Sequence, residues 1–164
     1  MGIDMNDIIV TREMLVADEA CDPAMEAFDE AFPNGSATLQ QIANPTLLGR
    51  KWIGYFAVNA SFLTEDIAMS LILKSEDPSK CYGEAAIRSH WVTPDLGPTL
   101  VSISDYPKVT IGEAAVRAHW VTSETGPAMI EKSFDPRYFS MFAIRHAKWM
   151  TPEIKAELIA KYGD

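Results

Sequence analysis

Cysteine and histidine are scarce in this sequence, which has two of the first and three of the second. Cys21 and Cys81 stand far apart, and neither has a second cysteine or a histidine pair at metal-ligand spacing. The pattern therefore predicts neither a zinc site nor a disulfide framework. Two buried thiols in a reducing cytoplasm are the expectation, and we expect no cofactor.

Long apolar runs are also missing. The longest, Ile67 to Leu73, is interrupted by Ser70 and is too short to span a bilayer. The first residues include Asp4 and Asp7 in place of a basic segment followed by an apolar one. We therefore expect no signal peptide and no membrane segment.

Basic residues are nearly lacking in the first third. Residues 1–49 hold nine acids against one base, Arg12, a net charge of −8, whereas residues 50–164 carry −1. Excess negative charge repels nucleic acids and anionic membranes, so direct binding to either is not expected. It favours a basic partner, including a protein surface that normally holds nucleic acid. The alternative is that the charge serves solubility alone.

Some of these acids follow an approximately helical spacing, and they form the predicted partner-binding site: Asp18, Asp22, Glu26, Asp29 and Glu30. Residues three and four apart share one face of a helix. Pro23 is expected to break any single helix through the stripe. The alternative is an ordinary solvated face.

The first third predicts short helices. Thr11 is a candidate cap for the first. Asp22-Pro23 predicts a second start, with Asp as the cap and Pro in the first helical position. Ser36 or Thr38 is expected to start a third, which continues through Leu39 and Ile42.

What the sequence does have is a 29-residue repeat. Four similar phrases begin at aromatic residues spaced by that step: Phe62, Trp91, Trp120 and Trp149. Pro78, Pro107 and Pro136 keep the same step. A fixed period of this size indicates a repeat architecture, in which these aromatic residues are expected to form the shared core.

Each copy predicts one good helix followed by a shorter one. Thr-Pro-acid phrases are typical helix starts. Gly97-Pro98 and Gly126-Pro127 are expected to interrupt the second helix after about one turn. Residues 99–103 have strand-like composition, but the matching segments favour a helix. The predicted fold is all-α, with a helical N-terminal region (1–45) packed on three to four repeat units (46–164).

The repeat resembles the variant leucine-rich repeat family, whose helical units carry an Ala/Val-Arg stretch, then Thr-Pro-Glu, then Leu and Asp. Ile87-Arg88, Thr93-Pro94-Asp95, Leu100 and Asp105 follow that order here, although the period is longer. The resemblance implies a stack of helical repeats.

The opening segment resembles small proteins encoded by bacteriophages and prophages. The resemblance rests on residues 9–15, Ala20-Cys21, Phe28 and residues 32–35. It implies an accessory phage gene, and such proteins include inhibitors of CRISPR complexes and of restriction enzymes.

No catalytic site is predicted. The sequence lacks a phosphate-binding glycine loop, a GxSxG elbow and an HExxH pair. His90 and His119 stand at equivalent repeat positions, where stacking would hold them too far apart to share a metal ion. Partly buried or stacked histidines are the expectation.

The function expected from these patterns is non-catalytic. It is a phage-encoded inhibitor that binds a host protein or ribonucleoprotein complex through its acidic surface, in the host cytoplasm. A phage structural or adaptor protein is the main alternative, and a small hydrolase using His90 and His119 is the third.

Overall fold

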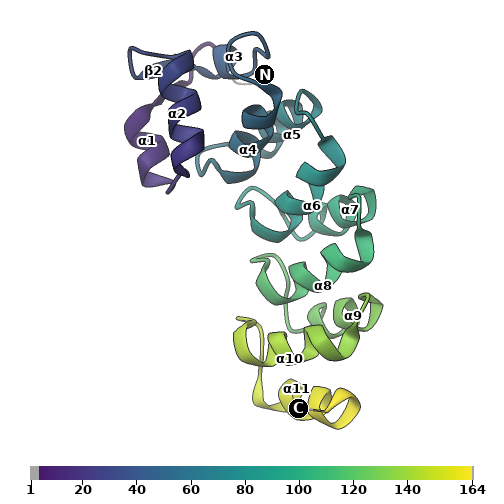
Figure 1. Ribbon diagram of the computed structural model, residues 1–164. Helices are drawn as coiled ribbons and strands as arrows, with labels where there is room; N and C mark the ends of the chain where they lie inside the picture. The colour runs from purple at the N-terminus through teal and green to yellow at the C-terminus, as the bar shows by residue number, and fades with distance from the viewer. Residues whose placement is uncertain (1–3, 164) are drawn as a thin grey trace. The chain divides into compact units, whose positions relative to one another are not determined.

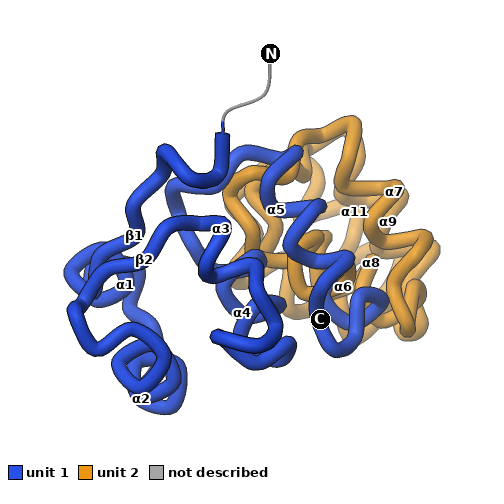
Figure 2. Tube along the Cα trace, turned by 90° about the horizontal axis from the view of Figure 1, so that it is seen from above, with its two compact units in different colours: residues 1–81 blue, residues 82–164 orange. Residues whose placement is uncertain are grey.

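The computed structural model describes residues 4–163. Within this range the chain forms eleven helices and one small pair of strands (Figure 1), so the predicted all-α class is confirmed. The chain divides into two compact units, residues 1–81 and residues 82–164 (Figure 2). The predicted boundary at residue 45 lies in the loop between the third and fourth helices, whereas the two units divide inside the sixth helix.

Unit 1 contains both strands and the first five helices: β1 (Ile9–Thr11), α1 (Arg12–Ala17), α2 (Asp22–Ala31), β2 (Ser36–Thr38), α3 (Leu39–Ile42), α4 (Arg50–Asn59) and α5 (Glu65–Leu73). Thr11 and Thr38 each accept a hydrogen bond from the backbone N–H three residues later, and so cap α1 and α3 as predicted. Helix α2 packs on α4, and α4 packs on α5. The N-terminal helices therefore rest on the first repeat copy.

The strand pairing was not predicted. β1 and β2 run antiparallel, with Val10 opposite Ala37, and both of these side chains are buried. Ser36, a predicted helix start, lies in β2, and the helix begins after Thr38. The pairing joins two three-residue segments that are distant in sequence, so neither is long enough to show an alternating pattern.

Unit 2 repeats one pattern. Helix α6 (Pro78–Arg88), which begins in unit 1, is followed by α7 (Leu96–Ile103), α8 (Pro107–Arg117), α9 (Gly126–Lys132), α10 (Pro136–His146) and α11 (Pro152–Tyr162). Three helices start at the prolines that share the 29-residue step, and they have equal lengths, since α6, α8 and α10 each contain 11 residues. Figure 1 shows α8 and α10 side by side, with α9 packed against both. The predicted repeat is therefore present as successive helix pairs.

The Gly-Pro pairs act differently from the prediction. They lie in the first turns of the second helices and do not interrupt them, because α7 starts at Leu96 and α9 starts at Gly126. A proline in the first turn of a helix removes an N–H that would have no intrahelical acceptor. The strand-like residues 99–103 lie in α7, so the helical prediction for them is confirmed.

Two tryptophans connect successive repeats within unit 2. Trp120 Nε1 donates to the carbonyl oxygen of Ala86 at 2.7 Å, and Trp149 Nε1 donates to that of Ala115 at 2.7 Å. The two acceptors lie in the last turns of α6 and α8, where carbonyl groups lack intrahelical donors. Trp120 therefore caps the end of α6, and Trp149 caps the end of α8. Each indole also packs in the stack.

The same rings lie against glycines. A Cβ atom at Gly97 would stand 2.4 Å from the ring of Trp120, and one at Gly126 would stand 2.4 Å from the ring of Trp149. Any side chain at these two positions would displace the indole. The Gly-Pro pair thus lies in the first turn of a helix and leaves room for a tryptophan from the following repeat.

Buried serines end the shorter helices. Ser104 Oγ donates to the carbonyl of Val101, and Ser133 Oγ donates to that of Ile130. Ser75, the equivalent residue after α5, makes the same bond to Ile72. Each hydroxyl satisfies a carbonyl at a helix end inside the core.

The predicted aromatic core is largely present. Trp91 and Trp120 are buried, whereas Trp149 and Phe62 are half-buried. The cysteine prediction is correct for Cys81, which is buried, and wrong for Cys21, which is exposed before α2. Periodicity places no burial constraint on Cys21, because it lies outside the repeats.

Replacing Trp120 tests the connection between repeats. Trp120→Ala is expected to lower the free energy of unfolding by about 3–5 kcal/mol, because it removes a large core ring. Trp120→Phe keeps much of the packing but leaves the Ala86 carbonyl unpaired, at a cost of about 1–3 kcal/mol. Urea denaturation followed by circular dichroism measures both. Equal stability of Trp120→Phe and the wild type would show that the carbonyl bond contributes nothing.

Adding one methyl group tests the ring–glycine contact. Gly97→Ala is expected to lower the free energy of unfolding by about 1–3 kcal/mol through overpacking against Trp120. Gly49→Ala is the control, because its Cβ would meet the nearest atom at 3.9 Å, an ordinary contact. Thermal unfolding of both variants gives the comparison. A Gly97→Ala protein that melts at or above the wild-type temperature contradicts the close packing.

Candidate acidic binding surface

Helix α2 carries four of the five predicted site residues. It begins at Asp22 with Pro23 in its first turn and Cys21 as the capping residue. The expectation that Pro23 would break the stripe is wrong, because proline is accommodated in the first turn. Asp22 is therefore the first helical residue and not the cap. Asp22, Glu26, Asp29 and Glu30 consequently belong to one continuous helix.

The two sides of α2 differ sharply in exposure. Ala24, Met25 and Phe28 are buried. Asp22, Glu26 and Glu30 are exposed on another face, and Asp29 is half-buried. At 3.6 residues per turn these four acids fall within one sector of the helix, away from the buried side chains. We call Asp22, Glu26 and Glu30 the acidic row.

Asp18 lies apart from that row. It caps the end of α1, and its Oδ2 accepts the backbone N–H of Ser61 at 2.9 Å. Nearby, the backbone N–H of Cys21 donates to the hydroxyl of Tyr55 at 3.0 Å. The turn between α1 and α2 is thus attached to α4 and to the residues just after it. Asp18 has a structural contact, which its charge alone did not indicate.

Asp29 is also engaged. Its Oδ1 lies 3.1 Å from Nε of Arg12, the one base in the first third. The two side chains are about half exposed, so the pair contributes at most about 1 kcal/mol to stability. The pair joins the start of α1 to the last turns of α2 and offsets one negative charge of the helix.

The acidic row is the part of the predicted site that has no such contact among the described residues. Asp22, Glu26 and Glu30 form no ion pair within residues 4–163. They stand four residues apart, about 6 Å along the helix axis. The arrangement presents three exposed carboxylates in a line on one helix.

The histidines do not form a cluster of metal ligands within residues 4–163. His90 and His119 are exposed and not partly buried as expected, and His119 Nε2 lies 3.1 Å from the carbonyl oxygen of Ser89. Within residues 4–163 no three His, Cys, Asp or Glu side chains are grouped as metal ligands would be. Over the same residues, no helix combines the length and apolarity needed to cross a bilayer.

No protein-family model, curated protein or solved structure matches this sequence. The resemblances to variant leucine-rich repeats and to small phage proteins therefore stay predictions.

Two of the predicted site residues, Asp18 and Glu26, are expected to differ in their contribution to stability. Asp18→Ala removes the acceptor of the Ser61 N–H and is expected to lower the free energy of unfolding by about 1 kcal/mol. Glu26→Ala is the control and is expected to change it by less than about 0.5 kcal/mol, because Glu26 is solvated. Urea denaturation of the two variants side by side measures this difference. Equal effects would mean that Asp18 has no structural role.

Proposed function

We propose that this chain is a non-catalytic binding protein whose acidic row contacts a basic surface on a protein or ribonucleoprotein partner. The observation that carries the proposal is the exposed line of Asp22, Glu26 and Glu30 on α2. The rest of the first third adds to the negative charge around the row, since residues 1–49 carry a net charge of −8. Such a field attracts cationic surfaces and raises association rates.

The spacing of the row limits the kind of surface it fits. Its three carboxylates extend over about 12 Å with one charge every 6 Å or so. Duplex DNA carries one charge per about 1.7 Å of its axis. The row is therefore suited to a local cluster of lysines and arginines, such as one that positions a few phosphates, and not to a long nucleic-acid groove.

The specific form of the proposal is a phage-encoded inhibitor of a host defence complex, such as a CRISPR complex or a restriction enzyme. The chain would act in the host cytoplasm by occupying part of a nucleic-acid-binding surface. Two things support this form: the acidic row and the resemblance of the opening segment to small phage proteins. A phage adaptor is the competing function, and recovery of the chain with purified virions would favour it.

Charge reversal tests the acidic row. The partner is first recovered by affinity purification from a bacterial lysate and identified by mass spectrometry. Glu26→Lys combined with Glu30→Lys is then expected to weaken its binding by about tenfold or more at low salt. The wild-type affinity should also fall steeply between about 0.05 M and about 0.5 M salt, because screening shortens the range of the field.

A matched control is available on α11. Glu153 and Glu157 are exposed and have the same four-residue spacing, so Glu153→Lys with Glu157→Lys makes an equal change in net charge. This control should bind as the wild type does. Loss of binding in both double variants would indicate a general charge effect. Unchanged affinity in the α2 variant would exclude the acidic row as the contact.

A further inference from the structure

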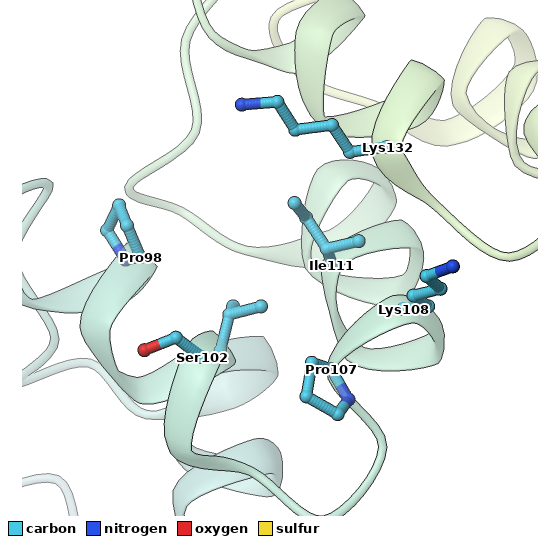
Figure 3. Close-up of a pocket in the computed structure, with 7 residues that line it drawn as sticks. Pro98, Ser102, Pro107, Lys108, Ile111 and Lys132 are labelled. Atoms are coloured by element: carbon cyan, nitrogen blue, oxygen red, sulfur yellow. The ribbon is translucent and has the colours of Figure 1, made fainter.

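A second candidate surface lies in unit 2, away from the acidic row in sequence and opposite in charge. A groove of about 330 Å³ is lined by residues of α7, α8 and α9 (Figure 3). Its lining residues are Pro98, Val101, Ser102, Pro107, Lys108, Ile111 and Lys132. The volume is at the lower end of the range for small-ligand sites, which leaves room for only one or two side chains.

The groove combines apolar walls with one cation. Figure 3 shows the Lys132 side chain extending above Ile111 toward the side where Pro98 lies. The Lys108 ammonium points away from the hollow in the same view. A ligand in the groove would therefore meet proline and isoleucine surfaces and a single ammonium group.

The next repeat shows what Lys132 lacks. One repeat later, Lys161 takes the position of Lys132, and Glu131 takes the position of Ser102. There, Lys161 Nζ lies 3.2 Å from Glu131 Oε1. Its hydrogen bond to Glu131, followed by one to Tyr162, raises the pKa of the Lys161 ammonium. The carboxylate at this repeat position is thus a partner for the lysine.

Lys132 has no such carboxylate. Ser102 stands in the glutamate's place, and its hydroxyl donates to the carbonyl of Thr99 in its own helix. Within residues 4–163 no salt bridge includes Lys132. The groove therefore has a lysine at its edge, but the acidic group that the neighbouring repeat provides through Glu131 is missing.

Two turns next to groove-lining residues carry exposed aromatic side chains. Tyr106 and Phe134 are 69% and 73% exposed, and they occupy the turns before α8 and α10. The Phe134 N–H donates to the carbonyl of Lys108 at 3.0 Å, which places this turn next to a groove residue. Both side chains leave apolar surface exposed on turns that adjoin the groove-lining residues Pro107 and Lys108.

We propose that the unit-2 groove binds an acidic–apolar segment of a protein partner. An apolar side chain of the segment lies between Pro98 and Ile111, and a neighbouring Asp or Glu pairs with Lys132. The partner's carboxylate takes the role that Glu131 has toward Lys161. This contact is independent of the acidic row, whose ligand is basic.

Two blocked tripeptides, acetyl-Leu-Glu-Leu-amide and acetyl-Leu-Gln-Leu-amide, are suitable probes. Amide chemical shifts of the full chain are followed during titration with each. The Glu peptide is expected to shift the signals of Ser102, Ile111 and Lys132. The Gln peptide should bind about threefold to fivefold more weakly, the range expected for loss of one exposed ion pair.

Substitutions sharpen the test. Ser102→Glu supplies the missing carboxylate within the chain and is expected to reduce Glu-peptide binding as much as Lys132→Gln does. Glu131→Ser is the control, because it removes the carboxylate of the neighbouring repeat and should leave the peptide-induced shifts of Ile111 unchanged. Equal binding of the two peptides, or undiminished binding to Ser102→Glu, would overturn the proposal. So would self-association of the chain that Ser102→Glu abolishes, since the occupant would then be a second copy.

Discussion

The hydrogen bond from a tryptophan indole to a helix-terminal carbonyl is the interaction on which unit 2 depends. Trp120 follows α8, lies against Gly97 of α7 and donates to Ala86 of α6. One side chain thus contacts both helices of the preceding repeat. Because its donor replaces a missing intrahelical partner, the ring fixes the register of the next repeat as well as its distance. Trp149 makes the equivalent contacts one repeat later.

These contacts join each repeat only to its neighbour in the stack. In repeat proteins, stability is close to a sum of terms within repeats and between nearest neighbours. Here the stabilisation between neighbouring repeats comes from identifiable contacts. The indole packs on a glycine and donates a hydrogen bond to a helix-terminal carbonyl. Buried serines at the ends of the shorter helices add a term within each repeat. The surface of the stack is less constrained than these contacts, so an exposed position such as Ser102 can differ between repeats without altering the packing of the helices.

The repeat was predictable because side chains with the same packing recur at a constant step, whereas the starts of α7 and α9 were not. Prolines at a constant step begin α6, α8 and α10, and the Thr caps of α1 and α3 have local signals. The pairing of β1 with β2 was not predictable, since it joins short segments far apart in the chain. The site was only partly predictable. Spacing predicted the acids of α2, whereas the contacts that distinguish Asp18 and Asp29 from the acidic row join residues far apart in the sequence.

The attachments around α2 have a consequence for any encounter with a partner. The turn before the helix is bonded to Ser61 and Tyr55, and the other end of the helix is paired with Arg12. The helix therefore needs no folding step on contact, and the entropy lost on association is confined to a few carboxylate rotamers and to overall motion. Such a preorganised surface favours binding without a conformational change in this chain. A partner would have to match the existing spacing of the carboxylates.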